Sequence, residues 1–166
     1  MSDSLLDRVN KGILGLKPYE PGKPINETQK ELGIKNIIKL ASNENPLGIS
    51  PKAFKVISEK KDLNRYPDGN ATSFKEVVSQ IEKIKTSMIT VGNGSNDLIE
   101  FVSKCFLSEG DNAIYSQHGF AIYPLAIKST GAKAIKAKAR DWGHDLNLMK
   151  DLVDENTKVI FLATPN

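Results

Sequence analysis

Apolar and polar residues alternate with two different periods, and the pattern is clearest in the second half of the chain. Strand-like apolar runs are separated there by segments with helical spacing, which place Leu98, Val102, Cys105 and Phe106 on one helix face. Strands that alternate with helices favour an α/β fold with a mostly parallel sheet. The expected strands cover residues 88–91, 112–116, 133–139 and 157–164. The last run is nearly all apolar, so we expect it to be buried on both faces.

The helices between these strands have recognisable ends. A helix over residues 120–130 must hold Pro124 in its first turn, because proline breaks a helix interior. Asp145 is expected to cap a further helix over residues 146–153.

The first half of the chain is less regular and predicts an arm followed by separate elements. Ser50 before Pro51 signals a helix start, and Ser73 with Glu76 forms a capping box. We divide the chain into an N-terminal helix and arm, residues 1–36, and an α/β part, residues 37–166. The elements expected in the first half are a helix over 4–16, an extended arm over 17–27, a strand over 37–42, and helices over 51–60 and 74–84.

Composition and charge exclude several classes of function. The 166 residues are 39% hydrophobic, and 23 basic residues oppose 20 acidic ones, with no long basic run that would indicate nucleic-acid binding. Cys105 is the single cysteine, which excludes an internal disulfide and fits a reducing compartment. No segment approaches the ~20 apolar residues that cross a bilayer. No His, Cys or carboxylate group has metal-ligand spacing. We expect a cytoplasmic protein with no nucleic acid, membrane or metal as partner.

The stretch VGNGSNDLIEF, residues 91–101, combines a strand end, two glycines and a helix start. Helix N-termini present free N–H groups and partial positive charge, and glycines let backbone approach a phosphate closely. A tight turn with Ser95 as a simple cap explains the stretch equally well. The chain lacks a P-loop, and Asp97 stands where a dinucleotide fingerprint needs a third glycine. A cofactor with a single phosphate, such as pyridoxal phosphate, therefore remains.

Five segments together carry a resemblance to a known family. They are LASNENPLGISPKA, NRYPDGNATSFKEVV, VGNGSNDLIE, SQHGFAIYPLA and VIFLATPN, between residues 40 and 166. In this order they resemble the N-terminal half of histidinol-phosphate aminotransferases, which are class I/II aminotransferases of fold type I. The resemblance runs from about Tyr19 to Asn166. It implies a three-layer sandwich, an incomplete large domain that binds pyridoxal 5'-phosphate, preceded by the arm and part of the small domain.

The resemblance also implies which residues bind the cofactor. Gly94, Ser95 and Asn96 match the phosphate cup at a helix N-terminus, and Phe120 matches the aromatic residue that stacks on the pyridine ring. Tyr66 matches the tyrosine that reaches the phosphate of the neighbouring subunit in a homodimer. Phe120 could instead be a core residue, and Tyr66 a turn residue ahead of Pro67.

Substrate contacts and the catalytic centre are only partly covered. Tyr19 and Asn45 match substrate-side elements, although Asn45 before Pro46 is also a plain turn signal. His118 beside Phe120 is expected to be a loop residue, because a lysine transfers the proton in this family. His144 precedes a helix cap and is expected to be structural. That lysine, which holds the cofactor covalently, is expected beyond Asn166, so no catalytic residue is assigned here. An end at TPN, directly after a buried strand, suggests a truncated chain.

The implied reaction transfers an amino group from L-histidinol phosphate to 2-oxoglutarate, giving imidazole-acetol phosphate and L-glutamate, in histidine biosynthesis. Two alternatives remain. One is a related pyridoxal-phosphate enzyme, such as an aromatic aminotransferase or a phosphothreonine decarboxylase. The other is a non-catalytic module that binds a phosphate ligand.

Overall fold

A computed structural model describes residues 8–19, 22–40, 42 and 44–165. It separates into two compact units, one formed by residues 1–19 with 87–166 and the other by residues 20–86. The boundary expected after residue 36 falls inside the second unit. The candidate phosphate cup lies in the first unit.

The first unit is built on a parallel sheet. Its strands are β1 (Asn112–Ser116), β2 (Lys133–Ala137) and β3 (Thr157–Phe161), in the spatial order β2-β1-β3. Both pairs are parallel, and Ile114 of β1 is paired with Ile135 on one side and Ile160 on the other. The predicted α/β fold with a parallel sheet is therefore confirmed.

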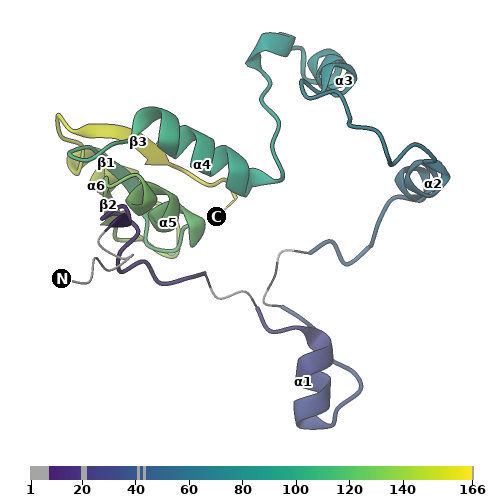
Figure 1. The fold of residues 1–166 in the computed structure, drawn as a ribbon. Coiled ribbons are helices and arrows are strands. Elements are labelled where there is room, and N and C mark those ends of the chain that lie inside the picture. The colour runs from purple at the N-terminus through teal and green to yellow at the C-terminus, as the bar shows by residue number, and fades with distance from the viewer. Residues whose placement is uncertain (1–7, 20–21, 41, 43, 166) are drawn as a thin grey trace. The chain divides into compact units, whose positions relative to one another are not determined.

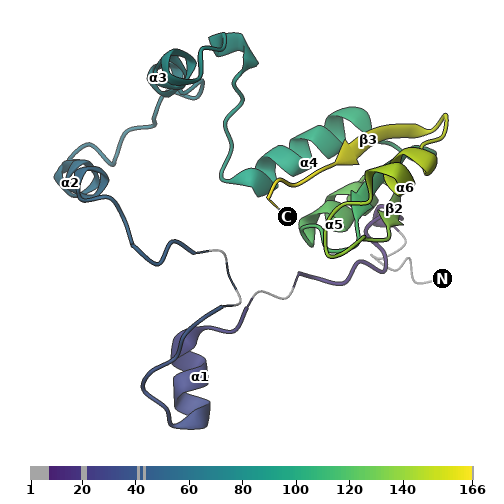
Figure 2. The same ribbon diagram turned by 180° about the vertical axis from the view of Figure 1, so that it is seen from behind.

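Helices lie on both faces of this sheet. Alternate side chains of β1 point to opposite faces, so Ala113 packs with Ile127 while Ile114 packs with Met149. The helices α4 (Ser95–Phe106) and α5 (Ile122–Ser129) lie on the face of Ala113, and α6 (Leu146–Asp151) lies on the face of Ile114. Figures 1 and 2 show these layers from the front and from behind.

Local sequence signals explain where these helices begin. Pro124 sits in the first turn of α5, where its missing N–H costs no helical hydrogen bond. The Asp145 carboxylate accepts a hydrogen bond from the Leu148 N–H at 3.0 Å and caps α6 as expected. The two helices predicted here are confirmed, each a few residues shorter than expected.

Several predicted features of the first unit are wrong. Residues 88–91 form no strand, because the 3-10 turn η2 (Thr86–Met88) precedes irregular backbone with no strand beside it. Turns replace the expected helix over the described residues 8–16, while residues 4–7 lie outside the described part. The predicted face of α4 is largely exposed, and Ser103 is buried instead. β3 is not buried on both faces, since Lys158 and Ile160 are exposed.

The described residues of the second unit form three α-helices, and none of the three has a buried side chain. They are α1 (Ile25–Leu32), α2 (Pro51–Glu59) and α3 (Thr72–Glu82). α2 confirms its prediction, whereas α1 was not anticipated. No strand forms at residues 37–40 and 42, because no other strand in the described part lies alongside them. Ser73 and Glu76 do not cap α3; the Asp68 carboxylate instead accepts from the Thr72 N–H at 2.7 Å.

Candidate functional site

The start of α4 is a tight loop that leaves donors exposed. Gly94 adopts a φ of +78°, a left-handed value that glycine reaches without strain. A Cβ on Gly92 would lie 2.9 Å from Cβ of Asp97, so only glycine fits that close approach. The side chain of Asp97 closes the loop, because its Oδ2 accepts from the Asn93 N–H at 2.8 Å.

This geometry suits a phosphate group. No side chain caps the first turn of α4, and the side chains of Ser95 and Asn96 are exposed. The first N–H groups of a helix have no partner within the helix and lie at its positive end. A hydroxyl, an amide and these N–H groups can donate hydrogen bonds to a phosphate dianion together. The donor set therefore fits the phosphate of a cofactor.

Phe120 lies on the turn that follows β1. The turn is closed by a hydrogen bond of 2.9 Å from the Gly119 N–H to the Ser116 carbonyl. The Phe120 ring contacts Tyr123 edge-to-face at 6.1 Å between centroids, and Tyr123 stacks on Phe161 at 4.8 Å. Phe120 remains 40% exposed. A ring held by its edge with exposed surface can stack on a planar heteroaromatic group.

The fold brings these two features to the same edge of the sheet. α4 precedes β1 and runs back across the sheet, so it starts where the parallel strands end. Figures 1 and 2 show the segment after β3 ending beside the start of α4. Ligands of open α/β sheets bind outside the carboxyl ends of the strands. Ser95, Asn96 and Phe120 thus lie where such a ligand would bind.

The other expected site residues come from other segments of the chain. Tyr19 is exposed in the N-terminal segment of the first unit. Asn45 and Tyr66 belong to the second unit. The Asn45 side chain accepts from the Leu47 N–H and donates to the Gly48 carbonyl, both at 3.0 Å, so it stabilises a turn. Tyr66 is fully exposed.

Two supporting residues were missed by the sequence analysis. Asp97 holds the loop before α4, and Tyr123 holds the edge of the Phe120 ring. Asp97 lies four residues after Asn93, whose N–H it accepts from, and Tyr123 lies three residues after Phe120. Such spacings bring groups together at the start of a helix. None of Ser95, Asn96 and Phe120 exchanges a proton near neutral pH, so these side chains could bind and orient a ligand but could not carry an acid-base step.

The described residues contain neither a candidate metal site nor a candidate membrane span. Across the described residues, no group of three or more His, Cys, Asp or Glu side chains could hold a metal ion. No helix in that part of the chain is long and apolar enough to cross a membrane.

Known proteins match the whole chain. No protein-family model matches it. "Histidinol-phosphate aminotransferase 2" of Pseudomonas fluorescens is 46% identical over 169 residues, covering 100% of this chain and 46% of that protein. "Histidinol-phosphate aminotransferase 1" of Mannheimia succiniciproducens is 48% identical over 164 residues, covering 98% of this chain and 45% of that protein. The chain therefore spans just under half the length of these relatives.

Solved structures support the same fold. The crystal structure of histidinol-phosphate aminotransferase from Sinorhizobium meliloti, in complex with pyridoxal-5'-phosphate, matches 96% of this chain and 43% of its own. Its TM-score is 0.80 at 19% identity. An aspartate aminotransferase from Thermotoga maritima matches 84% of this chain and 40% of its own, with a TM-score of 0.65 at 17% identity. The chain is similar in sequence to histidinol-phosphate aminotransferases along its whole length, and its fold matches the corresponding part of fold-type I aminotransferases.

Proposed function

We propose that this chain is the cofactor-phosphate-binding part of a histidinol-phosphate aminotransferase. The enzyme would transfer an amino group from L-histidinol phosphate to 2-oxoglutarate, giving imidazole-acetol phosphate and L-glutamate, in L-histidine biosynthesis. The observation that carries the proposal is the 46–48% identity with two enzymes of that name along the full chain. The donor set at the start of α4 supports it independently, because both substrates of such an enzyme meet a phosphate-bearing cofactor.

Pyridoxal 5'-phosphate would be held by the residues at the carboxyl edge of the sheet. Ser95, Asn96 and the first N–H groups of α4 would donate to its phosphate, with Gly94 giving the backbone its required turn. Phe120 would lie against its ring and keep water from that face. When bound, the cofactor supplies an electron sink for the substrate carbanion, which no side chain provides.

Residues of the second unit would contribute on the substrate side and across subunits. We propose a cytoplasmic homodimer in which Tyr66 donates its phenol hydrogen to the cofactor phosphate of the neighbouring subunit. Its full exposure within the chain leaves the hydroxyl accessible for this role. Tyr19 and Asn45 would line the substrate side. The lysine that holds the cofactor and moves the proton is proposed to lie outside these 166 residues.

The first experiment is to sequence the coding DNA directly after the Asn166 codon. We expect the frame to continue with an N-P-T-G motif and later a lysine motif. The protein from this complete reading frame should then transfer nitrogen from L-glutamate to imidazole-acetol phosphate, whereas the 166 residues alone should show no turnover. A stop codon directly after Asn166, or turnover by the 166 residues alone, would contradict the proposal.

Parallel assays separate the related enzymes. Turnover with aromatic amino acids but not with histidinol phosphate would identify an aromatic aminotransferase. Release of carbon dioxide from phosphothreonine would identify a decarboxylase. Binding of pyridoxal phosphate without any turnover by the complete reading frame would leave a binding module.

A further inference from the structure

The loop between β2 and α6, residues 138–145, contacts both neighbouring segments at the carboxyl edge of the sheet. We propose that this loop is a brace that positions the Phe120 turn relative to residues 162–165, with Gln117, His118 and His144 as its positioning residues. The proposal rests on the proposed function, because it concerns the same cofactor site. The sequence alone does not predict a positioning role for Gln117, His118 or His144.

The first tie joins the brace to the turn after β1. The Gln117 N–H donates to the Ala137 carbonyl at 2.8 Å, and the Ala139 N–H donates to Gln117 Oε1 at 3.1 Å. These bonds continue the pairing of β1 with β2 beyond the ends of both strands. They fix Gln117, three residues before Phe120, against the start of the brace.

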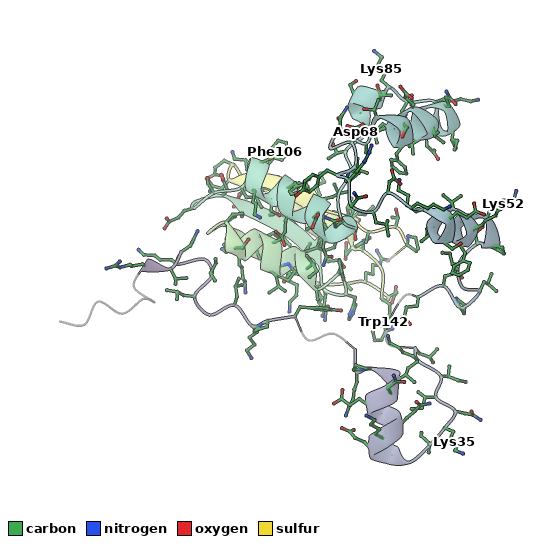
Figure 3. All side chains as sticks on the ribbon, turned by 45° about the vertical axis from the view of Figure 1, so that its right-hand side comes forward. Lys35, Lys52, Asp68, Lys85, Phe106 and Trp142 are labelled. Atoms are coloured by element: carbon green, nitrogen blue, oxygen red, sulfur yellow. The ribbon has the colours of Figure 1, made fainter. Side chains whose placement is uncertain are left out.

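The second tie is a ring stack. The rings of His118 and Trp142 lie 4.8 Å apart between centroids with 30° between their planes. Trp142 is 80% exposed, so burial in the core does not explain its place. Figure 3 shows Trp142 well away from Phe106 at the end of α4. The stack therefore holds an otherwise exposed ring next to the residue two positions before Phe120.

The backbone of the brace is a tight turn that gives this stack its geometry. Arg140 and Gly143 exchange two backbone hydrogen bonds, at 3.1 and 2.9 Å. Asp141 and Trp142 at its centre have φ values of +48° and +65°. Bulky residues rarely adopt such values, and they persist when surrounding contacts fix them. The His118 ring is such a contact.

The third tie reaches the segment after β3. His144 Nε2 lies 2.8 Å from the Ala163 carbonyl oxygen. Because a carbonyl only accepts, Nε2 carries the hydrogen and donates it. Nδ1 of the same ring is buried without a partner among the described residues. One half-buried ring thus makes one directed hydrogen bond, and that bond joins the brace to residues 162–165.

Together the ties connect the two segments that flank the proposed cofactor. Gln117, His118 and Ala163 cannot shift without straining a contact to the brace, and Phe120 follows His118 by two residues. A misplacement of about 1 Å in a binding group can cost a large factor in function. A loop that only closed the gap between β2 and α6 would need neither the ring stack nor the bond to Ala163.

The test compares His144→Phe, which keeps a planar ring but removes the donor, with His144→Gln, which keeps an N–H near the same place. A first readout needs no cofactor: amide hydrogen exchange of residues 117–121 and 162–165. We expect His144→Phe to speed exchange in both segments and His144→Gln to leave both protected. Faster exchange confined to residues 162–165 would overturn the brace.

The second readout is pyridoxal phosphate affinity in the protein from the complete reading frame. We expect His144→Phe, which loses a hydrogen bond, and His118→Leu, which loses a ring stack, each to bind about 3- to 10-fold more weakly. His144→Gln should bind normally. Trp142 is the single tryptophan of these 166 residues, and its emission in the 166-residue chain should change in His118→Leu and report the lost stack. Unchanged affinity in both folded variants would overturn the positioning role. A wild-type protein that binds no pyridoxal phosphate, yet shows the coupled exchange, would refute the proposed function and keep the brace.

Discussion

Gly92 and Gly69 differ in what surrounds them, and that difference makes the α4 loop testable at a single residue. We predict that Gly92→Ala destabilises the first unit by about 1–3 kcal/mol, because its methyl group would overlap Asp97. The same change should weaken pyridoxal phosphate binding, since the loop that exposes Ser95 would have to shift. Urea unfolding and equilibrium dialysis measure the two effects.

Gly69→Ala is the matched control for this change. Its Cβ would meet nothing within 4 Å, and its φ is not in the left-handed region. We expect unaltered cofactor binding and a stability change within ~0.5 kcal/mol. Equal losses for the two alanine variants would show that the close approach of Gly92 to Asp97 does not matter.

A buried amide at the other edge of the sheet supports a second prediction. Asn112 is almost fully buried; its Nδ2 donates to Asp154 at 2.7 Å, and its Oδ1 accepts from the Thr157 hydroxyl at 2.8 Å. Asn112→Ala would remove one hydrogen bond from each partner, while the bonds between Asp154 and Thr157 and from Asn156 to Asp154 remain. We therefore expect a loss of about 0.5–1.5 kcal/mol per hydrogen bond removed. Thermal unfolding checks this. The control is Asn147→Ala, because Asn147 is exposed. Asn147→Ala should lower the free energy of unfolding less than Asn112→Ala does, and an equal or larger loss would contradict the prediction.

The same network predicts a pKa change. The hydrogen bond from Asn112 is the main cause that lowers the pKa of Asp154. Asn112→Ala should therefore move that pKa back up, towards the ordinary aspartate value. A carbon-detected NMR titration of the carboxyl group measures it. An unchanged pKa would mean that the other hydrogen bonds to Asp154 are sufficient.

Residues of the candidate site were found by resemblance, whereas their supports needed coordinates. Ser95 and Phe120 stand in recognisable motifs, and the structure places both at the carboxyl edge of the sheet. Which side chain holds them depends on distances within a few ångströms, as for Asp97 and Tyr123. The contact of His144 with Ala163, 19 residues apart, has no local signal at all.

At the scale of elements, the sequence predicted helices and strands well where their partners are present. β1, β2 and β3 were expected because each apolar run has a neighbour to pair with in the sheet. Residues 37–42 and 88–91 have similar composition but no adjacent strand in the described part, and isolated strands are not stable. Strand propensity is therefore necessary here, but a segment forms a strand only where another strand pairs with it.

The helix α1 was missed although its end signal is present. Gly33 adopts a left-handed φ of +66°, and its N–H donates to the Gln29 carbonyl, as in a typical helix C-terminus. The prolines at residues 18, 21 and 24 suggested an extended arm throughout. Pro24 immediately precedes the helix, a position that proline tolerates because no helical N–H is needed there.

The start of α3 predicts a dependence on pH. The Thr72 side chain and backbone, followed by the Asn70 backbone, lower the pKa of Asp68 to about 2. A depressed pKa means that the contribution is complete above the ordinary aspartate pKa of about 3.9 and is lost as pH falls towards 2. We therefore expect the amide signals of Asn70 and Thr72 to titrate in this window in NMR spectra.

Asp68→Asn tests the cause of that titration. The amide cannot ionise, so the signals of residues 70–72 should become independent of pH between about 4 and 2. The control is Asp62→Asn, because Asp62 is exposed in the same loop. This change should leave the titration of the Thr72 amide signal unchanged. A transition in wild-type protein centred near the ordinary aspartate pKa would contradict the hydrogen bonds to Asp68.

On the scale of the whole molecule, a three-stranded sheet with short helices leaves apolar surface uncovered. Ile160 of β3 and Phe101, Val102 and Phe106 of α4 are exposed within the chain. Exposed apolar side chains promote association in solution where they are contiguous. The sequence could not anticipate this exposure, because helical spacing identifies an apolar face without saying what packs on it. Phe106, the last residue of α4, and Leu107, which follows it, test which side of the helix is buried.

Substitution should destabilise the fold much more at Leu107 than at Phe106. Phe106 is 62% exposed and Leu107 is 6% exposed, in the cluster with Ala113 and Ile127. Leu107→Ser should therefore cost about 2–5 kcal/mol of unfolding free energy, as for a large-to-small core change. Phe106→Ser should cost less than ~0.5 kcal/mol and reduce self-association of the 166 residues. Urea unfolding and sedimentation velocity measure both. If Phe106→Ser were the more destabilising change, the face of α4 predicted from the sequence would be the buried one, and the packing of α4 described here would be wrong.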